Sequence, residues 1–326
     1  MTTVFYKQII TVIYNRSNII FCDLRSYAQE FVEPIRKIAQ FIAKVDVLLS
    51  FANVSSENNY VRPIIDNSND LFIKNGRHAV VEKILPLGQY IANDLMLVCD
   101  TKNFEYTQFM ILTGPNMAGK STYMRQNALI VILAQIGCFV PADEAKIGIV
   151  DKIFTRVGAV DDLSLGQSTF MVEMNETANI LNYATEKSLI LLDEIGRGTS
   201  TYDGVAIAWS VAEYIATQIK ARTIFATHYH ELNVMANKIP QIKNYRITIE
   251  ENNGEIRFLR KVIQGSASKS YGIQVAKMAG LPKSVVSEAE KLMVKMQKNY
   301  SNDLSQNKHK QEIKVEVPQL NLFDTV

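Results

Sequence analysis

The 326-residue chain has few cysteines and little net charge, and each shortage excludes a class of protein. Its three cysteines, Cys22, Cys99 and Cys138, lie far apart and lack metal-ligand spacing. This excludes a disulfide-stapled scaffold and a cysteine-based zinc site, so we interpret all three as structural. The formal net charge of +2 excludes a strongly basic chain, and contact with nucleic acid cannot be argued from charge.

The N-terminal segment lacks the long apolar run of a signal peptide or a membrane span. Between residues 1 and 21, polar side chains such as Lys7, Asn15 and Arg16 interrupt every apolar stretch. A membrane span needs roughly 20 apolar residues. We therefore expect no membrane association and a cytoplasmic location, in a bacterial-type cytosol or an organelle stroma. The apolar share of 47% is sufficient for a buried core.

Hydrophobic spacing predicts two kinds of structure along the chain. From Phe31 to Ala52, apolar residues recur at alternating steps of four and three, which indicates one helix with an apolar seam. Periodicity favours a helix packed on its own domain over an arm-like coiled segment. Further on, short apolar runs at 109–113, 188–192 and 223–227 alternate with helix-like stretches. This alternation predicts an α/β fold with a mostly parallel sheet covered by helices.

The last part of the chain changes character twice. Pro282 opens a helical stretch with apolar residues along one side as far as Met296. From residue 299 the chain is polar, which is typical of a flexible tail. We expect three parts, at residues 1–60, 61–298 and 299–326.

A glycine-rich loop follows the first apolar run and precedes a helix-like stretch. It has the spacing of a phosphate-binding P-loop, in the strand–loop–helix context that this motif requires. Glycines let backbone N–H groups curl around phosphate oxygens at a helix N-terminus. In this motif the lysine bonds the phosphates and the following serine ligates Mg²⁺. The loop residues are Gly114, Pro115, Asn116, Met117, Ala118, Gly119, Lys120, Ser121 and Thr122.

Three further segments predict partners for this loop. The apolar run 189–192 ends in Asp193, which can hold Mg²⁺ through its water shell, and Glu194, which can activate water. His228 follows the third apolar run, either to sense a terminal phosphate or as an ordinary packed histidine. Ser168 precedes a helix-like segment, either as a donor to an anion or as an ordinary N-cap.

The order of these segments resembles one family, the MutS mismatch-repair ATPases of the ABC-type superfamily. The likeness extends from about Phe31 to Met296. Four motifs carry it, beginning at Gly114, Ser168, Leu192 and Ala226: Gly-Pro-Asn-Met-Ala-Gly-Lys-Ser-Thr-Tyr-Met-Arg-Gln, Ser-Thr-Phe-Met-Val-Glu-Met, Leu-Asp-Glu-Ile-Gly-Arg-Gly-Thr-Ser-Thr-Tyr-Asp-Gly and Ala-Thr-His-Tyr-His-Glu-Leu. The chain departs from the family pattern at Gln167 and Ala79, outside the catalytic set.

The resemblance implies a Mg²⁺-dependent ATPase whose composite sites are shared by two copies of the chain. ATP or ADP would lie on residues 114–122 of one copy, and Ser168 of the other would reach the γ-phosphate. Tyr90 matches the aromatic residue that stacks on adenine. The nucleotide, Mg²⁺, water-activating and switch positions of the family match Asn116, Asp193, Glu194 and His228 respectively.

The resemblance also implies roles for the flanking segments. Residues 31–51 resemble the end of a lever helix, which makes residues 1–60 the remnant of a lever or core helical domain. Residues 266–272 resemble the segment that packs against the partner's ATPase domain, so residues 61–298 would hold both the ATPase and a helical dimerisation segment. Within the tail, Gln319–Phe323 resembles the short peptide by which bacterial repair proteins dock on the sliding clamp.

The function that this resemblance implies is ATP-driven control of DNA clamping in a mismatch-repair protein. Mismatched duplex DNA and a MutL-type protein would be partners of the full-length family protein. The family's mismatch-reading domain would lie upstream of the retained part, so we expect this chain not to distinguish mismatched from matched DNA. The alternatives are a dimerisation module with an idle ATPase and a MutS paralogue that acts in recombination. An ABC-type ATPase for transport would need membrane spans.

Overall fold

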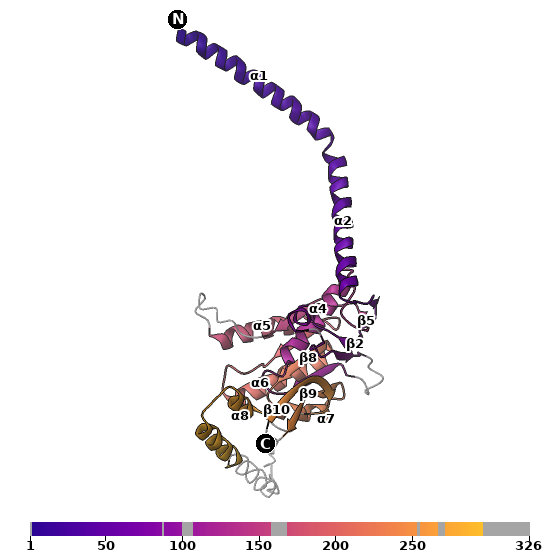
Figure 1. Cartoon of the computed structure of the whole chain (residues 1–326), viewed down its shortest axis with the longest axis vertical. Helices are drawn as coiled ribbons and strands as arrows, with labels where there is room; N and C mark the ends of the chain where they lie inside the picture. The colour runs from indigo at the N-terminus through magenta and orange to yellow at the C-terminus, as the bar shows by residue number, and fades with distance from the viewer. Residues whose placement is uncertain are drawn as a thin grey trace, which may run out of the picture. The chain divides into compact units, whose positions relative to one another are not determined.

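The computed structural model describes residues 2–86, 88–99, 107–157, 168–252, 255–266 and 271–295. The chain forms two compact units, the first of residues 1–98 with 125–151 and the second of residues 99–124 with 152–326. Each unit contains one sheet, and helices accompany both sheets (Figure 1). The predicted α/β class is therefore confirmed, whereas the predicted boundaries at residues 60 and 298 stay predictions.

Two long helices open the first unit. They are α1 (Thr2–Glu30) and α2 (Val32–Glu57) (Figure 1). A single non-helical residue, Phe31, separates them. Three residues of the apolar seam on α2, Ile35, Ile38 and Ile42, are 58–62% exposed. The expectation that this helix packs on its own domain is thus wrong for this seam. Periodicity identifies the apolar face of a helix, but it does not show what covers that face.

Helix α2 is also the one helix within the described ranges that is long and apolar enough to cross a membrane. Only 6% of its most apolar 18-residue stretch is buried. A single helix of this kind is weak evidence, because helices that never enter a membrane meet the same criterion. The expected absence of membrane association therefore stays a prediction.

The sheet of the first unit is small and mixed. Its strand order is β1 (Ile64–Asp66), β5 (Glu144–Gly148), β2 (Leu71–Gly76) and β3 (Asn93–Leu97). The first pair is parallel and the other two are antiparallel. Burial alternates along β2 and β3, so one face of this sheet is covered. The short helix α3 (Val81–Ile84) follows β2.

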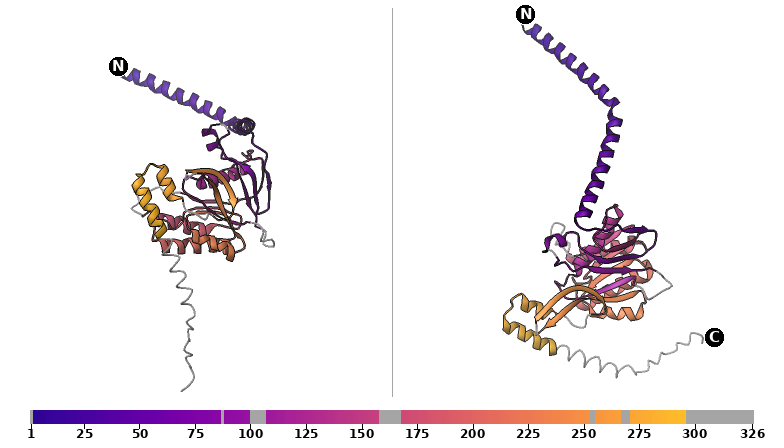
Figure 2. Two further views of the ribbon diagram at one scale, coloured as in Figure 1. Left: turned by 60° about the horizontal axis from the view of Figure 1, so that its bottom comes forward. Right: turned by 45° about the vertical axis from the view of Figure 1, so that its right-hand side comes forward.

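The sheet of the second unit has six strands and is mostly parallel. Its order is β10 (Glu255–Gln264), β9 (Ile242–Asn252), β4 (Phe109–Thr113), β8 (Arg222–Thr227), β7 (Leu189–Asp193) and β6 (Ile153–Arg156). Only the β9–β10 pair, the long orange ribbon at one edge, is antiparallel (Figure 2). The three predicted apolar runs coincide with β4, β7 and β8, and this part of the prediction is confirmed.

Helices cover this second sheet. Helix α4 (Lys120–Gln135) begins directly after the glycine-rich loop, and its residues from Arg125 onward belong to the first unit. The other helical segments of the second unit are α5 (Thr169–Tyr183), α6 (Thr201–Tyr214), η2 (Ile215–Ile219), η3 (His230–Val234), α7 (Met235–Lys238), α8 (Gly272–Met278) and residues 283–295. Strands β4 and β8 are buried along their whole length, as parallel strands covered on both faces must be.

Strand register brings distant parts of the sequence to one edge of this sheet. Thr113, at the end of β4, lies opposite Thr227, at the end of β8. Asp193, at the end of β7, lies opposite Ala226. Since parallel strands end on the same side, the loops that follow these three strands are neighbours, which is where α/β sheets bind ligands.

The first unit should not tolerate a side chain at Gly148. A Cβ atom there would lie 2.0 Å from the carbonyl oxygen of Ser68. We expect Gly148→Ala to lower the free energy of unfolding by about 1 to 3 kcal/mol, because the backbone must move to relieve the overlap. Gly272→Ala is the matched control, since its Cβ would meet nothing within 4 Å. Equal denaturation midpoints for the two variants would contradict this account of the first unit.

Candidate functional site

The glycine-rich loop of residues 114–119 has a backbone that depends on its glycines. Gly114 and Gly119 have φ angles of 154° and 104°, which L-residues with side chains rarely adopt. Met117, at the loop tip, also has a positive φ angle, 68°, and is exposed. These turns let the loop curl and enter α4 at Lys120, so that N–H groups of the first helical turn face the loop.

Lys120 is a buried cation held within this loop. Its side-chain Nζ donates to the carbonyl oxygen of Gly114 at 2.6 Å and to that of Pro115 at 3.1 Å. The same atom lies 3.3 Å from Nε2 of His228. Burial lowers the pKa of Lys120 to about 8, although the nearby charges of Glu194 and Asp193 act to raise it.

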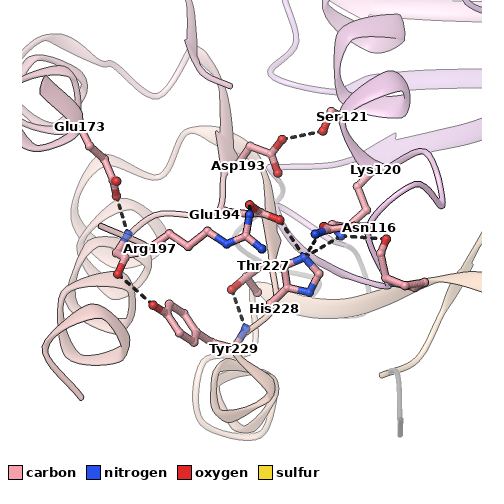
Figure 3. A network of polar contacts seen from close by, with 12 residues as sticks. Asn116, Lys120, Ser121, Glu173, Asp193, Glu194, Arg197, Thr227, His228 and Tyr229 are labelled. Carbon is pink, nitrogen blue, oxygen red and sulfur yellow. Dashed lines mark hydrogen bonds and ion pairs between the residues drawn. The ribbon is translucent and has the colours of Figure 1, made fainter. Parts of the chain in front are cut away.

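Ser121, the residue after Lys120, and Asp193, at the end of β7, bring two side-chain oxygens together. Oγ of Ser121 donates to Oδ2 of Asp193 at 2.6 Å (Figure 3). Burial raises the pKa of the Asp193 carboxyl, while the Ser121 hydrogen bond acts to lower it. Among the described residues no cluster of three or more His, Cys, Asp and Glu side chains could hold a metal. A hydroxyl and a carboxylate oxygen side by side are the kind of ligands that could hold Mg²⁺, which takes few protein ligands and completes its shell with phosphates and water.

Glu194 lies between two cationic or donor groups. Its Oε1 is 2.7 Å from Nε2 of His228, and its Oε2 is paired with the Arg197 guanidinium (Figure 3). Burial by itself would raise the pKa of Glu194, but the hydrogen bond from His228 and the charge of Arg197 outweigh it, so the pKa is lowered. Glu194 is thus a carboxylate at neutral pH. Its backbone has a φ angle of 59°, a conformation that costs energy in a non-glycine residue and is common at functional sites.

His228 joins the loop to the acidic strand. Its Nε2 also lies 2.7 Å from Oδ1 of Asn116, in the glycine-rich loop. One ring nitrogen therefore faces Asn116, Lys120 and Glu194 together (Figure 3). Asn116 and His228 also line a cavity of about 310 Å³, together with residues that include Arg197, Tyr271 and Val275.

Two predicted residues lie outside this contact network. Ser168 caps α5, because its Oγ accepts the N–H of Met171 at 3.2 Å, and its side chain is exposed. Among the described residues, Ser168 makes no contact with Lys120, Glu194 or His228. Tyr90 belongs to the first unit, where its hydroxyl donates to Oε1 of Gln126 at 2.5 Å. The roles predicted for both residues stay predictions.

Sequence reasoning assigned no role to three residues that the structure places in or beside this network. Arg197 pairs with Glu194, while Glu173 and Tyr229 bond the backbone of Gly196. All three belong to the motifs quoted above, but a motif does not show which of its members contact each other. The glycines at 196, 198 and 204 were the available signal, since several glycines after an acidic strand indicate close backbone approach.

The fold and the site together define an α/β protein in which a glycine-rich loop joins a parallel strand to a helix, beside the end of a second parallel strand where two acidic residues follow each other. The family model for MutS domain V matches residues 110–297. The chain therefore belongs to the MutS family.

Three similar curated proteins come from bacteria. The chain is 53% identical to the DNA mismatch repair protein MutS of Caldicellulosiruptor bescii over 299 residues, which is 91% of this chain and 34% of that protein. It is 53% identical to that of Flavobacterium johnsoniae over 286 residues, 87% of this chain and 32% of that protein. It is 54% identical to that of Clostridium botulinum over 276 residues, 84% and 29% respectively. The chain spans about a third of the length of these relatives.

Lys120→Met should change how stability varies with pH. Burial lowers the folded-state pKa of Lys120 to about 8, against an ordinary value of 10.5 in the unfolded chain. Between these values the unfolded chain binds the additional proton, so the parent's free energy of unfolding should rise with pH, by about 1 to 3 kcal/mol from this group. Denaturant unfolding at several pH values measures this rise, which the variant should lack.

The matched control for this experiment is Lys152→Met, which replaces an exposed lysine of the same unit. It should keep the parent's pH profile. Parallel profiles for the parent and Lys120→Met would show that Lys120 is not buried as a cation.

Proposed function

We propose that the chain binds ATP with Mg²⁺ and hydrolyses it, as the ATPase part of a MutS-type DNA mismatch-repair protein. The observation that carries this proposal is the meeting of Lys120, Glu194 and His228 beside the Ser121–Asp193 pair at one sheet edge. A buried cation, a metal-type oxygen pair and an ionised carboxylate are the groups that phosphoryl transfer to water needs.

The loop and Lys120 would hold the phosphates. Backbone N–H groups of residues 114–122 would bond the phosphate oxygens, helped by the dipole of α4. Lys120 would exchange the carbonyl oxygens of Gly114 and Pro115 for phosphate oxygens, a stronger charge-assisted contact. Ser121 and Asp193 would hold Mg²⁺, which supplies neutralisation of phosphate charge when bound.

Glu194 would orient and deprotonate the attacking water. Its lowered pKa keeps it ionised at neutral pH, which a general base requires. His228 contacts both Glu194 and Asn116. A phosphate that displaces one of these two contacts would therefore also change the other. This supports its proposed role as the switch. Tyr90 is the proposed stacking partner of adenine.

We propose that two copies of the chain share each site. The support is that Ser168 is exposed at the N-terminus of α5, where a second molecule can reach its hydroxyl and the neighbouring backbone N–H groups. The exposed seam of α2 supports a role as part of a lever, because such a seam requires a covering partner. Residues 283–295 belong to the proposed dimerisation segment.

The remaining proposals concern the whole repair protein. Duplex DNA, a MutL-type protein and a cytoplasmic location are proposed from the curated relatives' name, DNA mismatch repair protein MutS. The sliding-clamp peptide, Gln319–Phe323, lies outside the described residues.

Lys120→Ala and Glu194→Ala should separate nucleotide binding from turnover. Loss of the Lys120 cation should weaken Mg²⁺–ATP binding at least about tenfold, since a hydrogen bond to a charged group is lost. Loss of the Glu194 carboxylate should leave binding within about threefold and reduce turnover by about 10² or more, as expected for a general base. Titration calorimetry and phosphate release measure the two quantities.

Lys74→Ala and Glu144→Ala are matched controls for these variants, because they break an exposed Lys–Glu pair of the first unit. Both should behave like the parent. If Lys120→Ala binds ATP as tightly as the parent, the nucleotide assignment is wrong. If the parent binds ATP without turnover, the chain is instead the interaction module with an idle ATPase.

A further inference from the structure

Gly196 is held through both of its backbone polar groups. Its N–H donates to Oε1 of Glu173, on α5, at 2.5 Å. Its carbonyl oxygen accepts from the Tyr229 hydroxyl at 2.9 Å. In the sequence, Gly196 lies two residues after Glu194, and Tyr229 lies directly after His228. These two bonds, which we term the Gly196 clamp, join the segments that carry both proposed catalytic groups.

We propose that Glu173 and Tyr229 are positioning residues, which fix Gly196 and thereby the carboxylate of Glu194 for ATP hydrolysis. This inference rests on the proposed ATPase function. Neither residue is among the described contacts of Lys120, Ser121 or the glycine-rich loop, so each would act through Glu194 and His228 rather than on the nucleotide.

Close packing leaves the clamped loop little freedom. A Cβ atom at Gly196 would lie 2.4 Å from the carbonyl oxygen of Gly204, on α6. A Cβ atom at Gly204 would lie 2.5 Å from the Tyr229 hydroxyl, and one at Gly198 would lie 2.9 Å from Cβ of Phe170. The loop after β7 is therefore enclosed by α5, α6 and Tyr229, and small changes in these neighbours must move it.

Charge and protonation strengthen the two bonds of the clamp. Glu173 is buried, with its counter-ion Arg156 at 3.7 Å, and a carboxylate accepts a backbone N–H more strongly than a neutral oxygen does. Arg156 also pairs with Glu176 at 3.0 Å, so it remains neutralised if Glu173 is replaced. Burial and the charge of Glu173 raise the pKa of Tyr229, so its hydroxyl remains a donor to a higher pH than that of an ordinary tyrosine.

Glu194 needs such support because its own backbone is strained. With a φ angle of 59°, it occupies a conformation that persists only where the surroundings impose it. The bond from its N–H to the carbonyl oxygen of Ala226 holds one side, at 2.9 Å. The Gly196 clamp fixes the chain two residues further on. Because Ser168 is the N-cap of α5, displacement of this helix at Ser168 would reach the proposed general base through Glu173.

Tyr229→Phe and Glu173→Ala test the proposal through a kcat-against-KM split. Each variant removes one bond to Gly196, so kcat for ATP should fall at least about tenfold while KM and ATP affinity stay within about twofold. Glu173→Gln should recover most of kcat, because an amide oxygen can still accept the Gly196 N–H. Tyr245→Phe is the matched control, since it removes a tyrosine hydroxyl that contacts Thr107 instead.

Hydrogen exchange at the Gly196 amide gives a second readout that does not depend on turnover. It should be faster in Glu173→Ala than in the parent, and close to the parent in Glu173→Gln. Unchanged kcat in both Tyr229→Phe and Glu173→Ala, or equal losses in kcat and affinity, would overturn the positioning role. If Glu173→Ala does not fold, as judged by thermal melting, the kcat of Tyr229→Phe alone tests the positioning role.

The two readouts also separate this inference from the proposed function. If the parent shows no ATP turnover, the ATPase proposal has failed. The clamp is then judged by amide exchange alone, in which faster exchange in the variants supports it and unchanged exchange overturns it.

Discussion

The parallel register of β4, β8 and β7 is the constraint on which the site depends. It sets Thr113 opposite Thr227 and Asp193 opposite Ala226, so three loops that are far apart in sequence begin side by side. A register shift in any of these strands would separate Lys120 from Glu194 and His228. The strands are buried along almost their whole length, and their apolar side chains hold that register.

Charge burial is the second constraint, and it follows from the first. Meeting at a covered sheet edge removes Lys120, Asp193 and Glu194 from water, which penalises each charged form. The three groups respond differently because their neighbours differ. Lys120 has a lowered pKa, Asp193 a raised one, and Glu194 a lowered one because His228 and Arg197 outweigh its burial. In the proposed function, a phosphate and a divalent cation would bring the charges that complement these groups.

Apolar runs and the glycine-rich loop, which are short patterns in the sequence, correctly predicted the strands and the loop that depend on neighbouring residues. The apolar runs at 109–113, 188–192 and 223–227 are strands, and the glycine-rich loop does lead from β4 into α4. The mixed sheet of the first unit was not foreseen as a sheet. Its strands are short and are contributed by residues 64–148, with β5 inserted between β1 and β2, so pairing depends on contacts that periodicity cannot report. The exposed seam of α2 was misjudged for a related reason, since amphipathicity shows a face and not its partner.

In the candidate site, too, the sequence predicted some residues and missed others. The chemical types were recognisable at the end of a strand, in the loops that follow strands and at the start of the next helix, and these side chains do lie together: Lys120, Ser121, Asp193, Glu194 and His228. Glu173 and Tyr229 act on a backbone group, and nothing in the type of a residue indicates which backbone group it bonds. The roles of Ser168 and Tyr90 were assigned by resemblance, and they stay predictions.

We propose that two copies of the chain make each ATPase site, with Ser168 from one copy and the loop, Asp193 and Glu194 from the other. Mixing Ser168→Ala chains with Glu194→Ala chains tests it most directly. Each variant alone should be nearly inactive, whereas random pairing should restore about a quarter of the parent's ATP turnover, because half of the dimers would hold one unaltered site. If Ser168 serves the site of its own chain, every site in the mixture carries a substitution. Absence of any recovery above the separate variants would therefore contradict the shared site.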